Sequence, residues 1–164
     1  MRSFTLFLLL AVLALPVSAF QRSVSVQQYV SYDASMVVIE NATVIDGTGS
    51  AARTGQTILM QDGRISAVGA DVNIPEGAER IDGSGKTVIP GLIGMHNHTF
   101  YTTSQRRIQL DYTAPMLYLA SGVTTIRTTG SYAPYSELEL KQAINRGQRV
   151  GPKMFITGPY ITGG

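Results

Sequence analysis

The sequence contains no cysteine, so its 164 residues can form neither a disulfide nor a thiol nucleophile. Tryptophan is also absent, and only two histidines are present. Charged residues make up 15% of the chain, and 13 Lys and Arg stand against 11 Asp and Glu. The longest cluster of basic residues is the pair Arg106 and Arg107. A disulfide scaffold is therefore excluded, and we expect no nucleic-acid partner.

The remaining composition is that of a folded protein. Apolar residues make up 44% of the chain and the mean hydropathy is +0.10. This content is high enough for a packed core and unlike that of a disordered chain. The length predicts about one domain.

The first 19 residues have the pattern of a secretory signal peptide. Arg2 precedes an unbroken apolar stretch from Leu6 to Leu15, and residues 17–19 (Val-Ser-Ala) supply a small-residue cleavage site. A membrane-spanning helix requires roughly 20 apolar residues, so this stretch is too short to span a bilayer. We expect cleavage after Ala19, export to the periplasm or the extracellular space, and no membrane partner after cleavage. Residues 20–34, rich in Ser, Gln and Tyr, are predicted to be a linker.

From residue 36 to residue 89, short β-branched runs alternate with glycine-containing turns, which predicts strands. The runs cover residues 37–39, 42–45, 56–60, 64–68 and 87–89. Asp62-Gly63 between two of them predicts a tight hairpin. The glycine-rich segments 46–49 and 82–85 lack the features of a phosphate-binding loop, so we interpret them as ordinary turns.

After residue 89 the pattern changes to alternating strands and helices, which is typical of a parallel sheet. We predict strands at residues 91–96, 123–128 and 154–157 and helices at residues 112–121 and 137–146. For the second helix we expect a capping box of Ser136 and Glu139, an i,i+4 pair of Glu137 and Lys141, and a C-terminal cap at Gly147. Its apolar face would consist of Leu140, Ala143 and Ile144.

The two histidines, His96 and His98, end the apolar run of residues 88–95. In a strand they share one face while Asn97 points the other way, and two neutral imidazoles at this spacing can bind one divalent cation. On spacing alone, the pair could equally be a solvated strand end or two hydrogen-bonded core residues.

The surrounding residues favour a metal site. Residues 87–98, Thr-Val-Ile-Pro-Gly-Leu-Ile-Gly-Met-His-Asn-His, resemble the first barrel strand of the amidohydrolase superfamily, especially of imidazolonepropionase-like and metal-dependent prolidase-like members. Segments 41–47, 58–65 and 81–86 are similar to its small N-terminal β-sandwich. Segments 122–127 and 151–158 are similar to its second and third barrel strands. One residue departs from the pattern, since Gly94 stands where the family commonly has Asp.

This resemblance implies an α/β fold with a small β-sandwich over residues 35–88. Residues 89–164 would form the first βα units of an incomplete (β/α)8 TIM barrel of a metal-dependent hydrolase. A complete barrel of this kind takes about 250 residues, so the chain is expected to be an N-terminal fragment.

The resemblance also implies that His96 and His98 bind one or two divalent metal ions, with zinc the expected metal. A metal-activated hydroxide would then cleave a carbon–nitrogen bond other than a peptide bond, or a related dipeptide. The family's remaining ligands, a lysine, two histidines and an aspartate that also acts as general base, lie on later strands. No catalytic base is therefore assigned in this chain, and we expect it to be inactive alone.

Two residues are candidates for contact with a small-molecule amide, lactam or dipeptide substrate. Arg127, at the end of the second barrel strand, could bind a carboxylate, although a structural ion pair is the favoured explanation. Tyr101 follows the histidines and could line a pocket, although aromatic residues of such loops more often simply cover the top of the barrel. The sequence leaves the oligomeric state open, with a homo-oligomer among the candidates. The alternative hypothesis is an exported, β-rich binding or structural module without catalytic activity.

Overall fold

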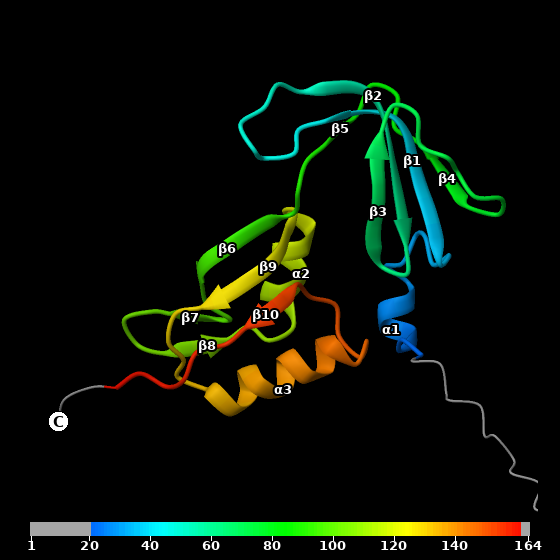
Figure 1. Cartoon of the computed structure of the whole chain (residues 1–164). Helices are drawn as coiled ribbons and strands as arrows, with labels where there is room; N and C mark the ends of the chain where they lie inside the picture. Colours follow the sequence, from blue (N-terminus) through cyan, green and yellow to red (C-terminus); the bar gives the residue numbers. More distant parts are fainter. Residues whose placement is uncertain (1–20, 162–164) are drawn as a thin grey trace, which may run out of the picture.

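The computed structural model describes residues 21–161, so the predicted signal peptide lies outside the described residues. A five-stranded sheet comes from the first half of the chain, and a three-stranded parallel sheet comes from the second half. Figure 1 shows the two sheets joined by the segment between β5 (Thr87–Val88) and β6 (Leu92–Asn97). The predicted mixed α/β class is confirmed.

The five-stranded sheet is built around β1 (Met36–Val44) and β2 (Arg53–Gln61), which are antiparallel. β3 (Arg64–Gly69) pairs with β2, while β4 (Glu79–Asp82) and β5 pair in parallel with the other side of β1. Within residues 21–161 these strands form a single sheet, whereas the resemblance implied a two-layered sandwich. β4 was not predicted because its sequence, Glu-Arg-Ile-Asp, has no apolar alternation.

The hairpin between β2 and β3 turns at Asp62 and Gly63, as the sequence predicts. Both residues have positive φ, 49° and 72°. A two-residue hairpin with positive φ at both positions matches the right-handed twist of the flanking strands. Gln61 and Arg64 consequently pair directly across the turn.

The two glycine-rich segments are ordinary turns, each closed by an aspartate. Oδ1 of Asp46 accepts hydrogen bonds from the hydroxyl of Thr48 at 2.7 Å and from its backbone N–H at 3.0 Å. The same bonds, the hydroxyl bond first, hold the pKa of Asp46 below its ordinary value of 3.8. Oδ1 of Asp82 accepts the N–H of Ser84 at 2.9 Å, and hydrogen bonds from Ser84 likewise lower the pKa of Asp82.

Replacing Thr48 with valine is expected to raise the pKa of Asp46 toward its ordinary value, because the variant lacks the hydroxyl that stabilises the carboxylate. Since folding lowers this pKa, the turn adds stability above the unfolded-state pKa and loses it as the pH falls through the folded-state pKa. Carboxyl ¹³C NMR titration measures the change. Thr54→Val, on the adjoining strand, is the matched control. An Asp46 pKa that is the same in Thr48→Val and wild type would contradict this account.

The second half of the chain forms strand–helix–strand units. β9 (Val123–Thr128) lies between β6 and β10 (Lys153–Phe155), and all three strands are parallel. α2 (Thr113–Ala120) connects β6 to β9, and α3 (Pro134–Asn145) connects β9 to β10. The predicted strand at residues 123–128 coincides with β9. A hairpin of β7 (Phe100–Thr102) and β8 (Arg107–Gln109), which the sequence did not predict, lies between β6 and α2.

The predicted start of α3 is wrong. The helix begins at Pro134, three residues before the expected position, so Ser136 lies inside its first turn and cannot form a capping box with Glu139. Proline suits a first helical turn because its missing N–H has no intrahelical partner there. The Ser136 hydroxyl instead donates a hydrogen bond to Oδ2 of Asp111.

The predicted end of α3 is confirmed. Gly147 has φ 60°, a conformation that glycine adopts without strain, and its N–H donates to the carbonyl of Ile144 at 2.9 Å. The N–H of Gln148 donates to the carbonyl of Ala143 at 2.8 Å, which completes a Schellman motif.

The core of the second half lies between β9 and α3. Ile126 is fully buried, and Met154 and Leu140 are almost fully buried beside it. Ile144 and Tyr118 pack against this cluster. The core therefore fixes β6, through its pairing with β9, relative to α3.

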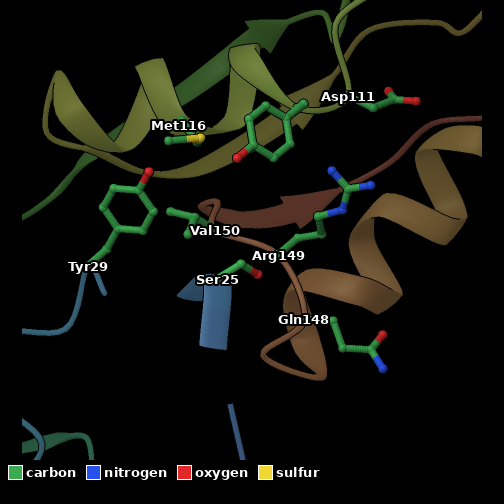
Figure 2. Close-up of a pocket in the computed structure, with 8 residues that line it drawn as sticks. Ser25, Tyr29, Asp111, Met116, Gln148, Arg149 and Val150 are labelled. Carbon is green, nitrogen blue, oxygen red and sulfur yellow. The ribbon is translucent and has the colours of Figure 1, made fainter. Parts of the chain in front are cut away.

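The segment predicted to be a linker contains α1 (Val24–Gln27), a single helical turn. The N–H of Ser23 donates to the carbonyl of Gly147 at 2.9 Å, so this segment docks on the loop after α3. Figure 2 shows the side chains that line a small pocket beside this segment, including Tyr29 and Arg149. They enclose a cavity of about 20 Å³, which has room for about one water molecule and not for a substrate.

Within the described part of the chain, every helix is too short or too polar to cross a membrane.

Candidate functional site

His96 and His98 lie at the carboxyl end of β6, where a bulge interrupts the sheet. Gly94 pairs with Ile126 and Asn97 pairs with Thr128, so two residues of β6 lie opposite Arg127 alone. Bulges re-aim side chains and are frequent beside active sites. The two imidazole rings are 5.3 Å apart between centroids and almost perpendicular, at 84°.

The main chain at His98 is held by α2. The hydroxyl of Tyr118 donates a hydrogen bond of 2.8 Å to the carbonyl oxygen of His98. The His98 side chain is half-buried, and within residues 21–161 its buried Nδ1 has no hydrogen-bonding partner. A buried ring nitrogen without a partner requires an explanation, and an occupant such as a metal ion would provide one. His96 is exposed.

Gly94 makes room for the side chain of Asn97. A Cβ atom on Gly94 would lie 2.1 Å from Oδ1 of Asn97, far inside van der Waals contact. An aspartate at position 94, the residue common in the resembled family, would force Asn97 to move. Gly94 therefore accommodates the Asn97 side chain in its present position.

A buried polar contact anchors the residue after His98. The hydroxyl of Thr99 donates to Oε1 of Glu137 at 3.1 Å, and both side chains are completely buried. Nε2 of Gln109 donates to the Thr99 hydroxyl at 3.1 Å. The predicted pair of Glu137 and Lys141 is wrong, because the first turn of α3 buries Glu137 against Thr99.

The two predicted substrate residues lie apart from the hydrogen bonds around His98. Arg127 is exposed on β9, opposite the bulge of β6. Tyr101 is 63% exposed on β7. The aromatic ring that contacts His98 is that of Phe100, with centroids 4.7 Å apart. Adjacent residues of a strand point to opposite faces, which separates Tyr101 from Phe100.

The two histidines do not by themselves complete a metal site. No group of three or more His, Cys, Asp or Glu side chains in residues 21–161 could hold a metal ion. A structural zinc site takes four protein ligands and a catalytic one three. The two imidazoles and the unpartnered Nδ1 of His98 fit the chemistry of a divalent cation, and further ligands are needed to complete a site.

Sequence reasoning missed three residues that position the site: Tyr118, Thr99 and Glu137. The sequence placed Tyr118 in a predicted apolar helix but gave no sign that its hydroxyl contacts His98. Glu137 carries no signal of burial, because a charged residue in a first helical turn is ordinarily solvated.

No protein-family model matches the chain. A dihydroorotase from Streptococcus pneumoniae is 32% identical over 110 residues, which cover 66% of this chain and 25% of the relative. An L-hydantoinase from Paenarthrobacter aurescens is 27% identical over 133 residues, which cover 77% of this chain and 28% of the relative. A prolidase-like structure from Bifidobacterium longum has a TM-score of 0.62 and 34% identity, and covers 76% of this chain and 30% of that one.

These proteins are amidohydrolase-type hydrolases, and imidazolonepropionases and an Xaa-Pro dipeptidase are also among the similar proteins. This chain is a relative of amidohydrolase-superfamily proteins and matches their N-terminal portion. The matched regions span 12–28% of the length of these curated relatives.

Proposed function

We propose that this chain is the N-terminal part of a longer, exported hydrolase that cleaves carbon–nitrogen bonds of small molecules with a divalent metal ion. The observation that carries the proposal is the histidine pair at the carboxyl end of β6, with Nδ1 of His98 buried and unpartnered in the described structure. Binding sites of parallel α/β folds lie at this end of the strands. The relatedness to dihydroorotases and hydantoinases supports the reaction class.

In this proposal His96 and His98 would hold the metal, with zinc the preferred ion. When bound, it would supply Lewis-acid chemistry that activates a water and polarises the carbonyl of the scissile bond. Tyr118 holds the main chain of His98 in place. Arg127 and Tyr101 would contact the substrate, an amide, a lactam or a dipeptide. The general base and the remaining ligands would come from the rest of the longer protein.

The finer architecture is also part of the proposal. Residues 35–88 would contribute one layer of a β-sandwich, and residues 89–164 would form the first units of a (β/α)8 barrel. The three parallel strands β6, β9 and β10, with their connecting helices, are compatible with the start of such a barrel. The partial coverage of the similar proteins supports the same interpretation.

His98→Asn is expected to weaken Zn²⁺ binding by about tenfold or more, because losing even an outer-shell partner of a metal ligand costs 10–100-fold. The measurement is competition with a chromophoric chelator, followed by hydrolysis assays with dihydroorotate, hydantoin and a dipeptide on the full-length protein from its source. Gln105→Ala, an exposed change on the nearby hairpin, is the control. Equal zinc affinity in wild type, His96→Asn and His98→Asn would refute the proposed ligands.

The intact mass of the exported protein tests the proposed length. A mass corresponding to a chain of about 400 residues would support a complete barrel. A mass matching residues 20–164 would favour the alternative, a binding or structural module without hydrolytic activity.

A further inference from the structure

A row of aromatic rings extends from His98 across the carboxyl ends of the three parallel strands. The ring of Phe100 lies 4.7 Å from that of His98, and the ring of Tyr132 lies 5.1 Å from that of Phe100. Tyr160 continues the row, 4.7 Å from Tyr132. These residues follow β6, β9 and β10 respectively, so three successive loops contribute to one wall. We call Phe100, Tyr132 and Tyr160 the aromatic wall.

The backbone holds this wall together. Ser131 and Pro159 form a parallel β-bridge, and the N–H of Tyr160 donates to the carbonyl of Ser131 at 3.3 Å. Gly130 has φ 98°, and a Cβ atom on it would lie 2.3 Å from the Tyr160 ring. The Tyr160 ring therefore packs directly on the backbone before Tyr132, and only glycine permits this approach.

Arg107 places a positive charge on the wall. Its guanidinium carbon lies 3.5 Å from the centroid of the Tyr132 ring, within cation–π distance. Arg107 is exposed, and no carboxylate in residues 21–161 forms an ion pair with it. A guanidinium that contacts a ring through one face keeps in-plane N–H donors, which match the two oxygens of a carboxylate.

The neighbouring Arg106 has a different role. Its backbone carbonyl accepts the Thr103 N–H at 2.8 Å and the Thr103 hydroxyl at 3.0 Å, which closes the β7–β8 turn. In the described residues, Arg107 forms the cation–π contact with Tyr132, and Arg106 forms no cation–π contact. The two arginines therefore lie on the same hairpin and carry the same charge, but only Arg107 contacts the aromatic wall.

We propose that Arg107 and the aromatic wall form a binding site for the carboxylate and the adjoining planar apolar group of the substrate. This inference rests on the proposed function and narrows its substrate class to carboxylate-bearing small molecules. The flat part of the substrate would pack against the exposed part of the Tyr132 ring, and its carboxylate would meet the edge of the Arg107 guanidinium. Arg127, on β9, is the competing carboxylate-binding residue.

The test compares two probes of the same shape, N-acetyl-L-phenylalanine and its primary amide, on the full-length protein by calorimetric titration. Wild type is expected to bind the carboxylate about tenfold more tightly than the amide, because a bidentate pair with arginine is lost in the amide. Arg107→Gln is expected to abolish this preference. Arg107→Lys is expected to restore less than half of it, because an ammonium lacks the planar fork.

Arg106→Gln is the matched control, and it should retain the full preference. Loss of the preference in Arg127→Gln but not in Arg107→Gln would overturn the proposal, as would equal binding of the two probes by wild type. Circular dichroism and thermal melting establish that each variant is folded. Probe binding is measured without zinc and without turnover. The carboxylate preference can therefore be interpreted even if the proposed metal-dependent hydrolysis is not observed.

Discussion

Replacing Ile126 with alanine is expected to lower the free energy of unfolding by about 2–5 kcal/mol. Ile126 is fully buried at the centre of β9 and packs with Leu140 of α3 and Met154 of β10. The variant loses the transfer free energy of the removed carbons and leaves a cavity where three elements meet. Because β6 is held to the rest of this unit by its pairing with β9, the change should also loosen the histidine pair.

Chemical denaturation followed by circular dichroism measures this loss. Ile65→Ala is the matched control, since Ile65 lies on β3 and is 67% exposed. Its effect should stay within about 0.5 kcal/mol, as for other surface substitutions. A loss below about 1 kcal/mol in Ile126→Ala would show that β9 is not the centre of the core.

Replacing Glu137 with alanine is expected to cost about 1–3 kcal/mol, because the buried Thr99 hydroxyl loses its acceptor. A cavity at the first turn of α3 adds to this cost. Glu137→Gln should retain most of the stability, because its amide oxygen can accept the same hydrogen bond. The ¹H–¹⁵N resonances of Thr99 and His98 should shift in Glu137→Ala and move much less in Glu137→Gln.

Glu139→Ala is the control for this pair of variants. Glu139 lies on the same helix and is exposed, so its truncation should change stability by no more than about 0.5 kcal/mol. Equal stability of Glu137→Ala and wild type would mean that the Thr99 contact contributes nothing to the fold.

Local sequence signals predicted the elements whose geometry a few neighbouring residues decide. Asp62-Gly63 specified its hairpin because both turn positions need positive φ. Gly147 specified the end of α3 for the same reason. β9 was predicted over its observed length, since it is a compact β-branched run that begins after a glycine. The start of α3 was misplaced because Ser136 and Glu139 fit a capping box that Pro134 pre-empts.

Elements held by distant partners were not predictable from the sequence. β4 is a strand because its backbone pairs with β1, some 40 residues earlier, and its own side chains carry no strand pattern. The strands of the β7–β8 hairpin are only three residues long and are joined by the polar segment 103–106, so neither strand is long enough to show the alternation of apolar residues that marks strands.

For the candidate site, the sequence by itself predicted that the two histidines lie together at the end of a strand. Both signals are local: the histidines follow an apolar run directly, and residues two apart in a strand share one face. Tertiary structure alone decided the surroundings of that pair. The register between β6 and β9 created the bulge, and the packing of α3 buried Glu137 against Thr99. The folding of three loops onto one edge brought Arg107 to Tyr132. Each of these contacts joins residues far apart in the chain, so their side-chain chemistry becomes informative only once the backbone brings them together.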